Sequence, residues 1–224
     1  PSPCNEMETV MTAIRLDIVS DVVCPWCVIG YKRLELAMQE LAGELQFEID
    51  WQPFELNPDL PPEGENATEH LMRKYGISRE QAEENRGRIA AIGRELGFEF
   101  RAGDDRRIYN TFDAHRVLHW AREQGRQTEL SLALFHAYFT EGRNPSDPAV
   151  LREAAEAQGL DGAEVEAIVA SDRYAQEVRE AEQRYVAAGI RGVPAYVINR
   201  QYLISGGQEP ATFMQAFRQI AAEA

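Results

Sequence analysis

Cysteine is scarce in this sequence, with three residues, Cys4, Cys24 and Cys27, among 224. A structural zinc site needs four ligands, and the chain has no second closely spaced cysteine pair or Cys–His pair to complete one. His115 and His119 are four residues apart and would share a helix face, but no further ligand accompanies them. We therefore predict no metal site, and the scarcity also excludes a framework of several structural disulfides.

The sequence also has few basic side chains and no long apolar run. Lysine and arginine number 23 against 37 aspartates and glutamates, which gives a formal net charge of −14. A chain this acidic repels nucleic acid and anionic membrane surfaces, so we expect neither as a partner. No apolar run approaches the roughly 18 residues that span a bilayer. The first residues lack the basic and then apolar pattern of a secretory signal, and we expect a cytoplasmic protein.

The stretch Cys24-Pro25-Trp26-Cys27 carries the chemistry that the sequence does offer. Residues 14–19 alternate as a half-buried strand does, and the residues after Cys27 have the apolar spacing of a helix. The pattern predicts Cys24 near the N-cap and Pro25 at the first helical position, where its missing N–H is harmless. Unpaired backbone N–H groups at a helix start stabilise a thiolate. We expect Cys24 to be the exposed nucleophile and Cys27 the buried resolving thiol.

A redox-active pair is favoured over a structural disulfide at this position. Two intervening residues bring both sulfurs within reach of one bond, but so short a loop restrains the unfolded chain little. A strand followed by C-x-x-C at a helix start is instead typical of a redox site. A pair that cycles between dithiol and disulfide also suits the cytoplasm better than a permanent bridge. Cys4 lies in a segment with nothing to order it, and we expect no redox role for it.

A second signal, Gly192-Val193-Pro194, lies far downstream and precedes a β-branched and aromatic run that predicts a strand. A C-P-W-C at the first strand–helix turn and a G-V-P before a late strand together resemble the thioredoxin superfamily. The resemblance implies a cis proline at Pro194 that faces the disulfide. It also implies that the Val193 backbone pairs with a substrate chain as an added strand.

The middle of the chain is predicted to be helical. Residues 45–54 alternate as a second strand, and the Pro- and Gly-rich residues 55–65 mark a boundary. The segments with helical spacing that follow are 67–75, 78–96, 112–123, 127–140, 148–158, 161–169 and 172–188. A strand hairpin at 195–199 and 201–205 and a last helix at 210–222 complete the chain.

These patterns predict two domains. A thioredoxin-like domain is formed by residues 12–58 and 172–224, and residues 59–171 form an inserted helical domain. This arrangement resembles the DsbA family rather than plain thioredoxin, and it implies an α/β, thioredoxin-like fold with a large all-helical insertion. Within the DsbA family, the chain resembles the FrnE-like branch of polyketide-type dithiol–disulfide isomerases. The stretches that carry this finer resemblance, besides Gly192-Val193-Pro194, are residues 20–27, 51–58 and 110–116.

The resemblance implies a thiol–disulfide oxidoreductase and isomerase that acts on protein disulfides through Cys24, Cys27 and Pro194. No cofactor is expected besides the Cys24–Cys27 disulfide, although glutathione could serve as the electron donor. Protein or small thiol and disulfide substrates are the expected partners, and a homodimer is left open. Two alternatives of the same fold also stay open: a glutathione-dependent small-molecule transferase or isomerase, and a binding protein with a redox switch.

Other residues have predicted supporting roles. Asp21 could move a proton to or from the second cysteine, or it could cap the helix or face solvent. Trp26 could shield the sulfurs and pack against a substrate, with simple surface cover as the alternative. The resemblance implies that His115 lines a substrate cleft between the domains, and Asn110 and Thr111 are expected to shape that cleft.

Overall fold

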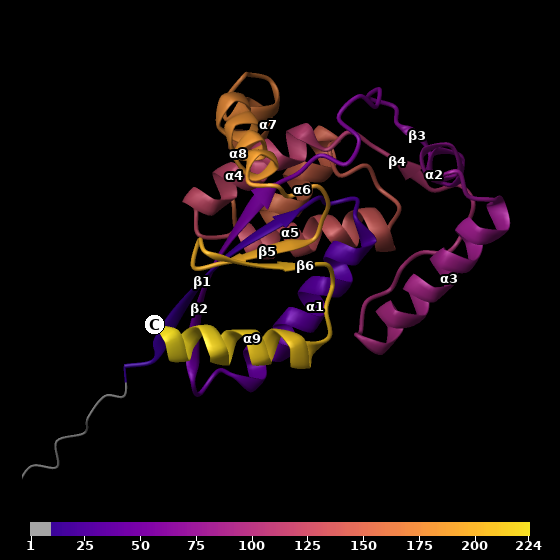
Figure 1. Cartoon of the computed structure of the whole chain (residues 1–224). Coiled ribbons are helices and arrows are strands. Elements are labelled where there is room, and N and C mark those ends of the chain that lie inside the picture. The colour runs from indigo at the N-terminus through magenta and orange to yellow at the C-terminus, as the bar shows by residue number, and fades with distance from the viewer. Residues whose placement is uncertain (1–9) are drawn as a thin grey trace, which may run out of the picture.

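A four-stranded sheet with the strand order β2-β1-β5-β6 forms the centre of the molecule (Figure 1). The computed structural model describes residues 10–224, so the prediction made for Cys4 lies outside the described residues. β1 (Thr12–Ser20) pairs in parallel with β2 (Leu45–Pro53) and antiparallel with β5 (Ala195–Ile198). β5 pairs antiparallel with β6 (Tyr202–Ser205). The two predicted N-terminal strands and the predicted hairpin are confirmed.

Two helices cover one face of the sheet. α1 (Pro25–Glu40) and α9 (Pro210–Glu223) pack against each other and lie below the sheet in the view of Figure 1. The fully buried ring of Phe217 meets that of Phe47 edge-on, with 5.0 Å between their centroids. Such an edge-on aromatic pair adds to the stabilisation that burial of the two rings provides.

The chain between β2 and the next sheet strand, β5, is mostly helical. Its helices are α2 (Ala67–Tyr75), α3 (Arg79–Glu95), α4 (Phe112–Glu123), α5 (Gln127–Phe135), α6 (Pro148–Ala157), α7 (Gly162–Val169) and α8 (Ala175–Ala187). α4, α5 and α8 contact β2 and lie above the sheet in Figure 1, so both faces of the sheet are covered. The second half of β1 is accordingly buried on both sides.

Several helix ends follow the sequence signals. Ser78 accepts a hydrogen bond from the backbone N–H of Gln81 at 3.1 Å, and the Gln81 side chain accepts one from the N–H of Ser78 at 2.9 Å. This reciprocal pair is the capping box that starts α3. Gly76 ends α2 in the left-handed conformation with φ of 65°, which costs glycine little because it has no Cβ.

Two details of the middle segment differ from the expected all-helical insertion. Glu65–Asn66 (β3) and Arg107–Ile108 (β4) pair in a small antiparallel ladder. α5 is followed by a π-helical turn, His136–Thr140 (η1). Strands of two residues are too short to show an alternating pattern, and a π turn keeps the general spacing of a helix. Among residues 10–224, no helix combines the length and the apolar character needed to cross a bilayer.

Candidate active site

Cys24 and Cys27 lie at the start of α1, shortly after the end of β1. Cys24 is the N-cap residue of α1 and Pro25 is its first helical residue, as the sequence predicts. The N–H of Cys24 donates to the Asp21 carbonyl at 3.1 Å, and the N–H of Cys27 donates to the Cys24 carbonyl at 3.1 Å. Both cysteines are free thiols in the structure. The tight turn therefore presents the two thiols at the positive end of the helix dipole.

Both cysteines are buried, with 4% of Cys24 and 1% of Cys27 exposed. The expectation of an exposed Cys24 is wrong, because residues distant in the sequence close over it. The expectation of a buried Cys27 is confirmed. Burial raises the pKa of the Cys27 thiol well above its ordinary value, and the neighbouring Cys24 raises it further, against hydrogen bonds from the Ser20 side chain and the Asp21 backbone. Cys27 is therefore a protonated thiol at neutral pH.

The Val193–Pro194 peptide bond is cis and lies beside Cys24. The thiol of Cys24 donates a hydrogen bond to the Val193 carbonyl oxygen, with 3.7 Å between sulfur and oxygen, across 169 residues of sequence. The N–H of Gly206 donates to the Pro194 carbonyl at 2.8 Å and so holds this loop against the end of β6. The two sequence motifs that predict the site are thus in contact.

A cavity of about 430 Å³, here called the Cys24 cavity, lies beside the thiol. Cys24, Pro25, Trp26 and Val193 form one side of it. The opposite side comes mainly from the α2–α3 arm, defined as residues 67–95, which extends to one side of the molecule in Figure 1. The volume is in the range of small-molecule sites. Sequence reasoning missed this wall, because helical spacing does not say which helix faces the cysteines.

The three residues predicted to shape a substrate cleft do not line the Cys24 cavity. Asn110 donates to the Pro58 carbonyl at 3.0 Å and accepts from the N–H of Phe112 at 2.9 Å, so it secures the start of α4. Thr111 is buried at the N-cap of α4. His115 points from α4 onto the sheet, because that face of the helix packs against β2. The cleft predicted at these residues is therefore not the Cys24 cavity.

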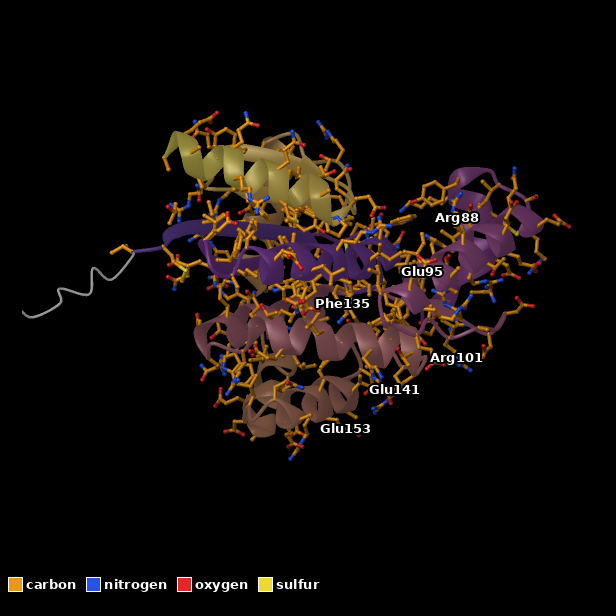
Figure 2. The ribbon with its side chains drawn as sticks, turned by 90° about the horizontal axis from the view of Figure 1, so that it is seen from below. Arg88, Glu95, Arg101, Phe135, Glu141 and Glu153 are labelled. Atoms are coloured by element: carbon orange, nitrogen blue, oxygen red, sulfur yellow. The ribbon has the colours of Figure 1, made fainter. Side chains whose placement is uncertain are left out.

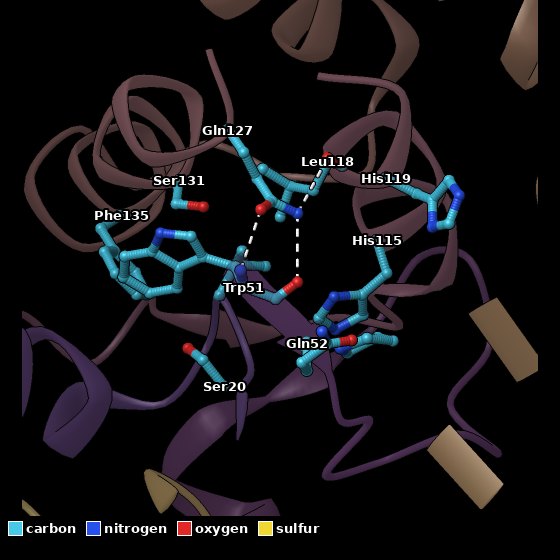
Figure 3. Close-up of a pocket in the computed structure, with 11 residues that line it drawn as sticks. Ser20, Trp51, Gln52, His115, Leu118, His119, Gln127, Ser131 and Phe135 are labelled. Carbon is cyan, nitrogen blue, oxygen red and sulfur yellow. Dashed lines mark hydrogen bonds between the residues drawn. The ribbon is translucent and has the colours of Figure 1, made fainter. Parts of the chain in front are cut away.

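His115 instead contacts Asp21 behind the cysteines. Its Nε2 lies 3.3 Å from the Asp21 carboxylate and 3.1 Å from the Phe54 carbonyl oxygen. A carbonyl only accepts, so Nε2 carries the proton. Burial alone would lower the pKa of His115, but the Asp21 carboxylate, followed by Glu182 and Glu55, outweighs it and raises that pKa. His115 also borders a second cavity of about 20 Å³ between β2 and helices α4 and α5 (Figure 3).

Further carboxyl groups lie close to this pair. Glu182 on α8 is half-buried, and burial together with the neighbouring Glu55 carboxylate raises its pKa to about 8. The Asp21 carboxylate accepts the N–H of Leu56 at 2.9 Å. Within residues 10–224 no hydrogen bond joins that carboxylate to Cys27, so the proposed proton transfer has no direct contact to carry it. The same residues contain no cluster of three His, Cys, Asp or Glu side chains arranged to hold a metal ion.

Comparison with known proteins places this geometry in a family. A family model described as a DSBA-like thioredoxin domain matches residues 15–218. The chain belongs to this family. The structure of the probable DsbA oxidoreductase SCO1869 from Streptomyces coelicolor is similar, with a TM-score of 0.87 and 36% identity over 94% of this chain and 91% of that chain.

Two further similar proteins are more distant. The Bacillus subtilis (strain 168) protein YwbO is 27% identical over 190 residues, which are 83% of this chain and 86% of YwbO. The cytosolic disulfide reductase DsbM from Pseudomonas aeruginosa has a TM-score of 0.66 at 16% identity, over 94% of this chain and 100% of DsbM. At that identity the likeness concerns the fold alone.

Proposed function

We propose that this DsbA-like oxidoreductase exchanges electrons between its Cys24–Cys27 pair and protein disulfides, and that it belongs to the FrnE-like branch. The observation that carries the proposal is the contact between the Cys24 thiol and the carbonyl of Val193, beside the cis Pro194. A reactive thiol and a backbone edge lie together there. A substrate chain that pairs with this edge would bring its own sulfur to Cys24.

The geometry supports an order of events for disulfide reduction. The Cys24 thiolate attacks one substrate sulfur, a mixed disulfide forms, and the other substrate sulfur leaves as a thiolate. Cys27 then loses its proton and attacks the Cys24 sulfur, which releases the second substrate thiol and leaves the Cys24–Cys27 disulfide. Two electrons pass to the substrate. Its raised pKa keeps Cys27 protonated until the mixed disulfide has formed, so that Cys24 attacks first.

We further propose that the exchange takes place in the cytoplasm and that glutathione or another small thiol returns the pair to the dithiol. The acidic composition supports protein and small thiol partners rather than nucleic acid. A glutathione-dependent transferase or isomerase is the second candidate function. The Cys24 cavity is the observation that favours it, because its volume of about 430 Å³ is in the range of small-molecule sites.

Insulin reduction with a dithiol reductant tests the proposal. The wild type is expected to accelerate precipitation of the insulin B chain, and Cys24→Ser is expected to be inactive because it lacks the attacking sulfur. Cys27→Ser should accumulate a mixed disulfide at Cys24 that mass spectrometry identifies. Cys4→Ser is the matched control and should retain full activity. A wild type that does not turn over insulin would contradict the protein-disulfide proposal and favour the second candidate.

A further inference from the structure

We propose that the Cys24 cavity binds a low-molecular-weight disulfide that carries carboxylate groups, and that Lys74, Arg88 and Arg106 recognise those carboxylates. The inference rests on the dithiol exchange proposed above. It names a substrate class for the same site and assigns a selective role to the α2–α3 arm.

The charge of the cavity is opposite to that of the molecule. The chain has a formal net charge of −14, so an average part of its surface carries more carboxylates than cations. The residues that line the Cys24 cavity include four cations and no aspartate or glutamate. The four cations are Lys74, Arg86, Arg88 and Arg106. A concave wall of one sign concentrates ligands of the other sign.

Three of these cations are available to a ligand. Arg86 already pairs with Asp104 at 3.3 Å. Lys74, Arg88 and Arg106 have no carboxylate within 4 Å among residues 10–224. Lys74 donates only to uncharged oxygens, and the Arg106 guanidinium lies over the Phe139 ring, 5.8 Å from its centroid. Arg88 lies on the α2–α3 arm (Figure 2) and donates to the side-chain oxygen of Asn85 at 3.2 Å. A carboxylate could therefore pair with these groups without displacing an ion pair.

Most of the remaining wall is apolar, and this apolar part reaches the reactive sulfur. Leu71, Ile77 and Ile89 of the α2–α3 arm line the cavity together with Phe100, and Trp26 lies next to Cys24 on the other side. A volume of about 430 Å³ fits a compact molecule with a short hydrocarbon body. The carboxylates would lie toward the arm and the disulfide toward Cys24.

The reaction follows the exchange already described. The reduced Cys24–Cys27 pair attacks the small disulfide, Cys24 forms a mixed disulfide with one half, and the other half leaves as a thiolate. Cys27 then displaces the bound half, so that one substrate disulfide yields two thiols and the protein keeps one disulfide. Pre-reduced protein completes one such cycle without any further reactant.

Single-turnover kinetics with disulfides of opposite charge test the inference. Pre-reduced protein is mixed with 3,3′-dithiodipropionate, which is anionic, with cystamine, which is cationic, or with 2-hydroxyethyl disulfide, which is neutral. Each rate is divided by the rate of free dithiothreitol with the same disulfide. The wild type should prefer the anionic over the cationic disulfide by roughly tenfold or more. The double variant Lys74→Gln/Arg106→Gln should lose most of that preference, because its rate with the anionic disulfide falls more than its rates with the other two.

Arg122→Gln is the matched control, because Arg122 is a cation of α4 that does not line the cavity. It should keep the wild-type preference. A wild type that prefers cystamine, as its net charge alone predicts, would overturn the inference, and so would a preference that survives in the double variant. If the neutral disulfide reacts and insulin is reduced, such a result leaves the proposed exchange intact. A protein that reacts with none of the three disulfides and does not reduce insulin would contradict both proposals.

Discussion

The ionisation of Glu182 makes the stability of the folded protein depend on pH. Its carboxyl group is half-buried on α8, one of its oxygens has no hydrogen-bond partner among the described residues, and its pKa is raised to about 8. Burial and the Glu55 carboxylate raise the pKa of Glu182, while the charges of His115 and Arg179 lower it. The folded protein therefore holds Glu182 as a neutral acid over a pH range in which the unfolded chain ionises it.

The stability of the protein should accordingly depend on the charge state of Glu182. A folded pKa above the unfolded value near 4.5 gives a contribution that is complete below about pH 4.5 and is lost as the pH rises toward 8. Glu182→Gln should remove this dependence. After allowance for solvent screening of a half-exposed group, the variant should be more stable than the wild type at pH 8 by about 1–2 kcal/mol.

Urea denaturation at pH 5 and pH 8 measures this difference. Glu180→Gln, a change of an exposed glutamate on the same helix, is the control and should follow the wild type at both pH values. Equal pH dependence in Glu182→Gln and the wild type would show that the carboxyl group is not held neutral.

At the residue scale, the sequence predicts the site residues that belong to short motifs. Cys24, Cys27 and Pro194 were predicted from two short motifs, and the structure brings the two motifs together. The environment of His115 could not be predicted, because its contact with Asp21 depends on the direction in which α4 lies on the sheet. Spacing indicates which residues share a helix face, and packing decides what that face meets.

At the scale of elements, α1 depends on a glycine where it passes the loop of the cis proline. A Cβ on Gly30 would lie 2.1 Å from the Tyr196 hydroxyl oxygen and 3.2 Å from both the Gly207 Cα and the Pro194 Cγ. Tyr196 is fully buried, so its ring has no space into which to move. The absence of a side chain at Gly30 thus lets the helix that carries the cysteines approach β5 closely.

Gly30→Ala should therefore destabilise the protein by about 2 kcal/mol, since overpacking a close contact typically costs 1–3 kcal/mol. It should also slow insulin reduction, because the clash displaces Pro194 from the cysteines. Gly87→Ala is the matched control: it lies within α3, and a Cβ there meets nothing within 4 Å. This control should be more stable than the wild type by about 0.5–1 kcal/mol, the usual gain for alanine in a helix. Thermal unfolding measures the stability of both variants. A Gly30→Ala protein as stable as Gly87→Ala would contradict the packing argument.

Helix bounds were predicted well where the sequence carries a capping residue or a terminal glycine. α2 and α4 begin and end at the predicted residues, and α3 starts at its capping box. The β3–β4 ladder was missed, because its pairing joins segments that are distant in sequence and too short to show a pattern.

At the scale of the whole molecule, Gln127 joins the helical segment to the edge of the sheet. β2 is an outer strand, and the N–H of its Trp51 donates to the Gln127 side chain at 2.9 Å. The Gln127 amide donates in return to the carbonyls of Trp51 and Leu118, at 3.1 Å each (Figure 3). One buried side chain thus satisfies backbone groups of a strand edge that would otherwise be open to another chain.

Gln127→Ala should cost about 2–3 kcal/mol in free energy of unfolding, because it leaves a buried strand N–H without an acceptor. The variant should also aggregate more readily on heating, since the edge of β2 loses its cover. Gln176→Ala removes an exposed amide on α8 and should change stability by less than about 0.5 kcal/mol. Chemical denaturation and light scattering measure the two effects, and a Gln127→Ala protein as stable as its control would show that the edge is satisfied in another way.

The overall fold was predicted from the sequence, while the arrangement of the helices about the sheet was not. Alternating strands and glycine punctuation predict a sheet with added helices, and the resemblance carried by the two motifs implies that the sheet is thioredoxin-like. The cationic wall of the Cys24 cavity depends on where the α2–α3 arm lies. The position of the arm is determined by contacts between side chains that are distant in the sequence. Such contacts cannot be predicted from a local sequence pattern.

The separation of 169 residues between Cys24 and Val193 matters during biosynthesis. The ribosome delivers the cysteine pair early, and the loop that covers it emerges only when most of the polypeptide has been made. Any product that stops short of that loop displays an unshielded pair of thiols, ready to cross-link with other proteins.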